Sequence, residues 1–278
     1  MHVSKYFILL FYLLSTNALA TEAPIWREER TGMAFARIPG GCFRMGSEEP
    51  ALAARPVHRV CLKPYWIGRH EVTNAEYGRC VAEGGCPAPE QRNTTPNDHF
   101  RTGNDDRYES MGASLGAGDH PQVGVSWVDA QRFGEWLSGK SGHRFRLPTE
   151  AEWEYACRGG VAEEIGASGE VSGEFAWYSA NSGGTTHAVG KKHPNGYGVY
   201  DMSGNAWEWV ADHFDARAYE SHTEQAPLFV KDDLFHVSRG GSWSSSAIHL
   251  HCAFRGVGEE RDRDDNLGFR LIREERAP

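Results

Sequence analysis

The chain lacks the features that mark several common classes of protein. It has no run of positive charge, and its 38 acidic and 29 basic residues give a formal net charge of −9. This balance argues against nucleic acid as a partner. No Cys-x-x-Cys pair occurs among the six cysteines, so zinc binding and thioredoxin-like redox chemistry have little support. No internal repeat or low-complexity tract is visible, and we expect one large domain.

The strongly apolar run at the N-terminus is too short to cross a membrane. A charged start precedes apolar residues from Tyr6 to Leu14, and small residues follow at Ala18 and Ala20. This order predicts a secretory signal over residues 1–20. A membrane anchor is the alternative, but a span needs roughly 20 apolar residues. We therefore expect a periplasmic or secreted protein with no membrane span.

Glycine, tryptophan and cysteine are plentiful. The 32 glycines and nine tryptophans indicate a loop-rich fold with aromatic anchors rather than a helix bundle or a regular sheet protein. All six cysteines follow the expected signal, and an even number in an exported chain favours disulfides. The spacing alone leaves their pairing open.

Short strands and three capped helices are predicted. Strand patterns occupy 34–38, 42–45 and 57–62, with Pro39 and Gly40-Gly41 as turn signals between the first two. Each helix start has a hydroxyl cap followed three residues later by a carboxylate, namely Thr73 with Glu76, Ser126 with Asp129, and Thr149 with Glu152.

Long irregular stretches separate these elements, at 87–120 and 158–200. Loops of this length are usually functional or held by ions or disulfides. For the polar stretch 87–120, plain variable surface is the alternative.

A series of motifs occurs in one order along residues 33–272. The longest are RLPTEAEWEYA at 146–156 and NGYGVYDMSGNAWEW at 195–209. The others are IPGG at 38–41, MGS at 45–47, EVTNAEY at 71–77, PQVGVSW at 121–127, RGGSW at 239–243 and NLGFR at 266–270. In sequence and order they resemble the formylglycine-generating-enzyme (sulfatase-modifying factor) family.

That resemblance implies an α+β fold related to C-type lectins, rich in loops and low in regular secondary structure. It divides the chain into the signal at 1–20, an N-terminal linker at 21–32 and a sulfatase-modifying-factor-like domain at 33–274. It also implies a disulfide between Cys157 and Cys252. We pair Cys80 with Cys86, which flank a short flexible segment, and this leaves Cys42 with Cys61 across two predicted strands.

The resemblance also implies a structural calcium site. Its ligands would be the carboxylates of Asp201 and Glu208 and the backbone carbonyls of Gly204 and Ala206, hard oxygen donors of the kind calcium prefers. Alternatively, Glu208 caps a turn or forms an ion pair while the tryptophans pack. A second calcium site of the family would involve Asn181, but its acidic partner is missing.

Formylglycine-generating enzymes bind copper through two cysteines shortly after Arg-Gly-Gly-Ser, because thiolates suit Cu(I). Here serines occupy that region, and Cys252 aligns with the disulfide cysteine. We therefore expect no copper and no formylglycine generation. His249 and His251 lie two apart, so on a strand they would share one face and could bind a metal. Alternatively they are polar residues that line a groove.

The resemblance also implies a substrate groove, which the segment 256–265 would face. Five residues before that segment are candidates for contact with substrate: Trp243, Ser244, His249, His251 and Arg255. Glu259 and Glu260 follow as a pair. A partly buried glutamate beside a second one has a raised pKa suited to acid–base catalysis, so Glu260 or Glu259 is our candidate base. The alternative is a solvated charge run with internal Arg–Asp pairing.

Two functions from different classes fit this pattern. One is a periplasmic oxidoreductase of the pyoverdine-maturation (PvdO-like) branch, which oxidises a dihydropyoverdine-type siderophore chromophore with molecular oxygen. The other is a non-catalytic lectin-like protein with a variable ligand groove at 243–266. The partner is a small-molecule or peptide substrate in the first case and a protein or glycan in the second.

Overall fold

The computed structural model describes residues 24–49, 53–89, 115–160 and 173–275. The expected signal at 1–20 lies outside these ranges, as do 90–114 and 161–172 of the two irregular stretches. Within the described ranges, no helix is both long and apolar enough to span a bilayer.

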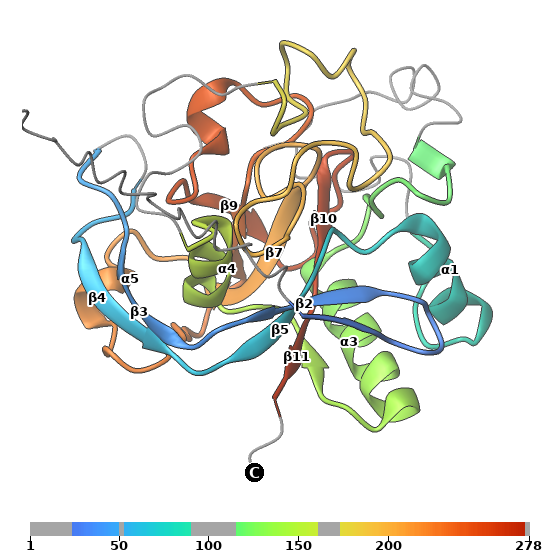
Figure 1. Ribbon diagram of the computed structural model, residues 1–278, viewed down its shortest axis with the longest axis horizontal. Coiled ribbons are helices and arrows are strands. Elements are labelled where there is room, and N and C mark those ends of the chain that lie inside the picture. The colour runs from blue at the N-terminus through green and yellow to red at the C-terminus, as the bar shows by residue number, and fades with distance from the viewer. Residues whose placement is uncertain (1–23, 50–52, 90–114, 161–172, 276–278) are drawn as a thin grey trace, which may run out of the picture.

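The larger sheet joins the two ends of the described chain. Its order is β1 (Ile25–Arg27), β2 (Ala34–Ile38), β5 (Tyr65–Gly68), β11 (Ile272–Glu274) and β6 (Phe145–Arg146), with antiparallel neighbours throughout. β1 lies within the segment expected to be a linker. Figure 1 shows β2 and β5 near the middle of the molecule and β11 running from there towards the C-terminus.

A second sheet carries most of the C-terminal motifs. Its order is β10 (Leu267–Phe269), β7 (Trp207–His213), β8 (Phe235–Arg239) and β9 (Gly256–Glu259), and β9 is an edge strand. β10 runs parallel to β7, and the other neighbours are antiparallel. A separate hairpin pairs β3 (Gly41–Met45) with β4 (His58–Leu62).

The three predicted capping boxes are confirmed. They begin α1 (Asn74–Ala82), α3 (Trp127–Ser141) and α4 (Glu150–Cys157), and in each box the hydroxyl accepts from a backbone N–H while the carboxylate accepts from the cap's own N–H. Two shorter helices follow, α5 (Ala218–Ser221) and the 3-10 helix η2 (Ala247–Leu250).

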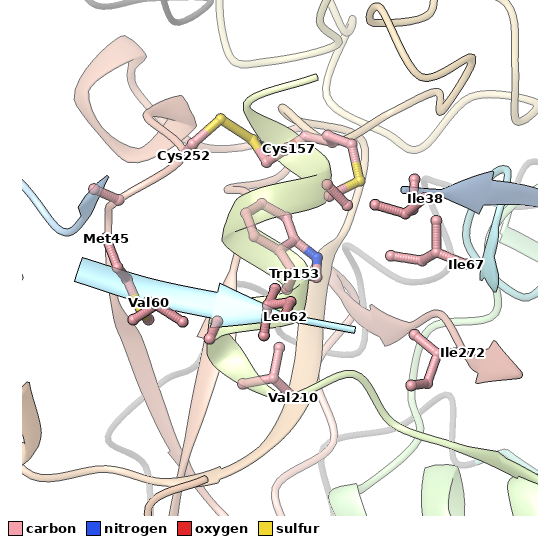
Figure 2. Packing of buried hydrophobic residues seen from close by; sticks show 14 of the residues in the cluster. Ile38, Met45, Val60, Leu62, Ile67, Trp153, Cys157, Val210, Cys252 and Ile272 are labelled. Carbon is pink, nitrogen blue, oxygen red and sulfur yellow. Dashed lines mark hydrogen bonds between the residues drawn. A yellow bond between two sulfur atoms is a disulfide. The ribbon is translucent and has the colours of Figure 1, made fainter. Parts of the chain in front are cut away.

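Helix α4 is the centre of the core. It lies between the β3–β4 hairpin and the strands β7 and β8 (Figure 1). Trp153 is fully buried in the middle of a cluster that includes Ile38, Val60 and Val210 (Figure 2). These side chains come from segments distant in sequence, so their burial holds the sheets together. Each Å² of apolar surface removed from water stabilises the fold by about 25 cal/mol.

All six cysteines are in disulfides, paired as expected: Cys42–Cys61, Cys80–Cys86 and Cys157–Cys252. Cys42 and Cys61 are direct cross-strand neighbours in the β3–β4 hairpin. The loop-rich character is also confirmed, since residues 173–206 contain no helix or strand of the two sheets. The fold is thus the α+β, loop-rich architecture that the motifs predict.

Candidate functional site

A cavity of about 340 Å³ lies at the edge of the second sheet. Eight of its eleven lining residues come from 243–266, the segment expected to face substrate. The lining consists of Trp207, Ser238, His249, Phe254, Arg255, Gly256, Val257, Gly258, Asp264, Asn266 and Leu267. A second cavity of about 630 Å³ beside α3 has none of the predicted site residues in its described lining.

Three aromatic rings form one wall of the 340 Å³ cavity. Phe254 packs on His249 with ring centroids 4.6 Å apart and on Trp207 at 5.8 Å. His249 sits in η2, where its Nδ1 lies 3.1 Å from the Ser246 hydroxyl. Burial lowers the pKa of His249, so its ring is neutral at pH 7. The wall therefore presents uncharged aromatic surface, with the three rings inclined to one another by 50–79°.

Arg255 lines the cavity, but its charge is balanced behind the wall. Its Nε and Nη2 donate to the two oxygens of Glu150 at 2.7 and 3.1 Å. Its Nη1 donates to the carbonyls of Asp215 and Ala53 at 2.9 and 3.3 Å. A guanidinium with these donors occupied has little capacity left to bind a substrate anion.

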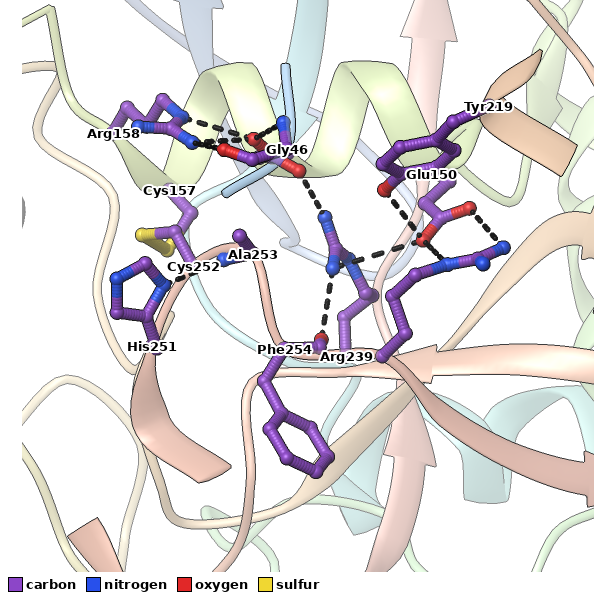
Figure 3. Close-up of polar contacts among 12 residues, drawn as sticks. Gly46, Glu150, Cys157, Arg158, Tyr219, Arg239, His251, Cys252, Ala253 and Phe254 are labelled. Atoms are coloured by element: carbon purple, nitrogen blue, oxygen red, sulfur yellow. Dashed lines mark hydrogen bonds and ion pairs between the residues drawn. A yellow bond between two sulfur atoms is a disulfide. The ribbon is translucent and has the colours of Figure 1, made fainter. Parts of the chain in front are cut away.

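A buried ion network fixes this part of the wall. Arg239 donates to the Phe254 carbonyl at 2.8 Å and to Glu154 at 2.5 Å, and neither charged side chain is exposed. Figure 3 shows Glu150 facing both Tyr219 and Arg239, while the Phe254 ring points away from them. Burial tends to raise the pKa of Glu150, but the charges of Arg255 and Arg239 outweigh it and lower that pKa.

The cavity's own acidic group is Asp264. Burial, followed by the charges of Asp262 and Asp265, raises its pKa to about 7. Among the described residues, no hydrogen bond or ion pair reaches its side chain. Its backbone is anchored, because its carbonyl accepts from the Gly124 N–H at 2.9 Å. A carboxyl group that titrates near neutral pH and faces a cavity suits acid–base chemistry.

The two glutamates predicted as bases lie at the end of the cavity-lining strand β9. β9 ends at Glu259, and Glu260 is already in the following turn, where its carboxylate accepts from Arg261 at 3.3 Å. Among the described residues that line the cavity, neither glutamate occurs. Their catalytic role stays a prediction.

The remaining predicted groove residues are not in the described lining of the cavity. Trp243 is buried, and its indole donates to the Asp265 carbonyl at 3.2 Å. The Ser244 hydroxyl accepts from the side-chain amide of Asn266 at 3.1 Å. His251 lies next to the Cys157–Cys252 disulfide and accepts from the Ala253 N–H at 3.1 Å (Figure 3).

The two histidines do not share a strand face. Residues 247–250 form the helix η2, so His249 lines the cavity while His251 lies beyond the helix end. The geometry that would let this pair bind one metal on a strand is therefore absent from this described segment. Among the described residues, three potential ligand atoms lie within 4.8 Å of one another only at Cys42, Cys61 and Glu224, and these cysteines are bonded to each other.

The predicted calcium ligands lie in a second buried acidic region. Glu208 accepts from Trp153 at 2.7 Å and twice from Arg270 at 2.6 Å. Asp201, at a positive φ of 55°, accepts from the Gly190 N–H at 2.6 Å. Glu71 is a third buried carboxyl group, close enough to Asp201 and Glu208 for their charges to act on it. Its buried Oε2 has no hydrogen-bond partner.

These groups fit a calcium ion. Three buried carboxyl groups lie near a single guanidinium, which pairs with Glu208, and burial followed by the neighbouring charges raises the pKa of Glu71. A carboxylate has about four lone-pair positions, and Glu208 uses three of them on Arg270 and Trp153. One position remains for a metal, together with Asp201 and the carbonyls of the glycine turn. Calcium would supply the missing positive charge and tie that turn to β7.

Asp264 is the acidic cavity-lining residue that the sequence does not single out. It belongs to the run from Arg261 to Asp265, for which a solvated charge run is the alternative interpretation. Arg263, which could have balanced it locally, instead pairs with Asp129 of α3 at 2.8 Å. Only this long-range pair shows that Arg263 does not balance the charge of Asp264.

Comparison with known proteins places the chain among relatives of the predicted family. The sulfatase-modifying factor enzyme 1-like domain family matches residues 22–275. The formylglycine-generating enzyme of Streptomyces coelicolor is 31% identical over 92% of this chain and 94% of its own length. The serine/threonine-protein kinase pkn1 of Chlamydia pneumoniae is 36% identical over 85% of this chain, but the match spans only 37% of the kinase.

Two solved structures have closely similar folds. PvdO from Pseudomonas aeruginosa superimposes with a TM-score of 0.74 at 28% identity, covering 91% of this chain and 99% of PvdO. Treponema denticola variable protein 1 gives a TM-score of 0.70 at 25% identity, with the same coverage of 91% and 99%.

Proposed function

Because the chain belongs to the sulfatase-modifying factor (formylglycine-generating-enzyme) family, we propose that it is an exported maturation oxidoreductase acting on an electron-rich aromatic small molecule. The proposed substrate is a dihydropyoverdine-type siderophore chromophore, in keeping with the structural likeness to PvdO. The feature that supports this proposal most directly is one cavity lined both by aromatic rings and by the Asp264 carboxyl group.

The chemistry balances with oxygen as the oxidant. Conversion of a dihydro ring to its aromatic form releases two electrons and two protons, and O₂ takes up both pairs to become hydrogen peroxide. Asp264 would remove the first proton, while stacking on Trp207 would hold the ring in place. All six cysteines are in disulfides, so no thiolate remains for Cu(I), and the electron-rich ring would react with oxygen directly.

The turnover test measures oxidation by the wild type and asks whether Glu260, the base predicted from the sequence, is required. The wild-type protein and a Glu260→Gln variant are incubated in air with the dihydro precursor, and chromophore absorbance and peroxide are followed together. We expect both proteins to turn over, with one peroxide formed per oxidised chromophore, because Glu260 lies outside the cavity. Loss of turnover in the folded Glu260→Gln variant would transfer the role of base to Glu260.

A binding protein is the second candidate function. The likeness to Treponema denticola variable protein 1 favours it, as does the location of most cavity residues in the 243–266 segment. If the folded, calcium-loaded wild type showed no turnover, the oxidoreductase proposal would be rejected and the binding function would remain.

We also propose a structural calcium ion held by the carboxylates of Asp201 and Glu208 and the carbonyls of Gly204 and Ala206. Its removal by EDTA is expected to lower Tm by about 5–10 °C, because a ligand present at 100 times its Kd stabilises by about 2.7 kcal/mol. Differential scanning calorimetry measures the shift, and added Ca²⁺ should reverse it. An Asp201→Asn variant is the control and should respond little. Equal Tm values for wild type with and without EDTA would contradict the site.

A further inference from the structure

We propose that the cavity selects a flat cation, namely a planar ring system that carries a delocalised positive charge such as an amidinium. The ring would stack on Trp207 and the charge would pair with Asp264. The inference rests on the proposed function only in placing the substrate in this cavity, and it names the substrate class. Its test requires no turnover.

The charges around the cavity favour a cation. Arg255 is the basic residue in the lining, and its donors are taken by Glu150 and two backbone carbonyls. The neighbouring arginines are also engaged, since Arg263 pairs with Asp129 and Arg261 contacts Glu260. The cavity therefore has no free described cation that would repel a positive ligand or attract an anion.

The negative charge, in contrast, is not balanced. Within the described part of the chain no partner reaches the Asp264 side chain, and Asp262 and Asp265 are near enough to act on it electrostatically. The Asp262 carboxylate accepts a hydrogen bond from the Glu259 backbone N–H at 2.8 Å. A cation in the cavity would relieve this repulsion, and in a partly desolvated site that attraction is stronger than in bulk water.

The shape and surface favour a flat ligand with a diffuse charge. Gly256 and Gly258 border the cavity, and a Cβ at Gly256 would come within 3.2 Å of Trp207. Backbone without side chains therefore lies along the indole. A cation over an aromatic face gains electrostatic attraction, most strongly with tryptophan. The volume of about 340 Å³ is at the small end of ligand sites, enough for one ring system.

The same ion pair would serve the proposed oxidation. A ring N–H that belongs to the cation would point at the carboxylate that holds it, so recognition and proton removal would use one contact. Asp264 would then determine specificity as well as act as the base.

Three ligands of equal size isolate the charge: benzamidine is cationic, benzamide neutral and benzoate anionic. Each is titrated into the calcium-loaded protein at pH 8 and low salt, and binding is measured by isothermal titration calorimetry. We expect benzamidine to bind about 10-fold more tightly than benzamide, with benzoate weakest. An Asp264→Asn variant should bind benzamidine and benzamide equally, and a control variant of an exposed glutamate outside the cavity lining, Glu220→Gln, should keep the preference.

Thermal melts of both variants establish that they are folded. Binding of benzamide or benzoate as tight as that of benzamidine would overturn the inference, as would an unchanged preference in Asp264→Asn or no binding of benzamidine at all. These outcomes are distinct from failure of the proposed function. If the protein oxidised a neutral ring but showed no preference for benzamidine, the proposed oxidoreductase function would stand and the proposed selectivity for a cation would not.

Discussion

Replacing Asp264 with asparagine is expected to lower kcat/KM by about 100-fold or more at pH 8, because a positioned general base contributes roughly 10²–10⁴-fold. Asparagine has nearly the same shape but cannot accept the proton. The measurement is the rate of chromophore formation at low substrate concentration. The wild-type rate remaining in Asp264→Asn would show that the proton is removed by another group.

The pH dependence gives this prediction a second readout. The ionised carboxylate is the active form, and the pKa of Asp264 is about 7. Wild-type kcat/KM should therefore rise with pH and level off above about 7, and the variant should lack this rise. His249, whose pKa is lowered by burial, and Arg255, whose charge is held by Glu150, are the other titratable groups in the lining.

A stability measurement separates lost chemistry from lost folding. The folded pKa of Asp264 is above the value of 3.8 in an unfolded chain, so the folded state binds the proton more tightly. Stability supplied by this group is complete below pH 3.8 and is lost as the pH rises towards 7. Asp264→Asn should accordingly be at least as stable as wild type at pH 8, and any advantage should shrink at pH 4.

Replacing Arg239 with methionine is expected to lower the free energy of unfolding by about 3–5 kcal/mol, the usual cost of removing one partner of a buried ion pair. Arg239 is fully buried and pairs with Glu154 at 2.5 Å, with Glu150 at 3.7 Å. Its loss leaves two buried carboxylates with less compensation and the Phe254 carbonyl without its donor. Urea denaturation followed by tryptophan fluorescence measures the change.

An exposed pair in the same protein is the matched control. Arg59 pairs with Glu224 at the surface, where 61% of the arginine side chain and 48% of the glutamate side chain are exposed. Arg59→Met should cost less than about 1 kcal/mol. If Arg239→Met is too unstable to purify, Arg239→Lys keeps the charge and should show a smaller loss. Equal losses at the two sites would contradict the role given to the buried network.

Local features of the fold could be predicted from the sequence because their causes are local. A hydroxyl and a carboxylate three residues apart are sufficient to define a capping box, as at Thr73 and Thr149. The strand 34–38 was predicted with the bounds that the structure shows. The glycine and tryptophan counts indicated the loop-rich architecture, and the short segment between Cys80 and Cys86 favoured that pair, whereas the Cys157–Cys252 pair followed from the family resemblance.

The site depended on contacts that no local pattern encodes. Glu259 and Glu260 looked distinctive as a pair, but the strand ends between them, and in the following turn Glu260, 25% exposed, pairs with Arg261. Asp264 looked like one member of a solvated run. It stands out only because Arg263 pairs with Asp129, which is 134 residues away in the sequence.

The titration of Asp264 tests the central claim, that a desolvated carboxyl group in this cavity is the acid–base centre. The side-chain carboxyl carbons of protein with ¹³C-labelled aspartate are followed by NMR from pH 3 to 9, and the Asp264→Asn variant assigns the resonance. We expect an apparent pKa of about 7. A value near 3.8 would show that the group is solvated and ordinary, and would contradict its assignment as the base.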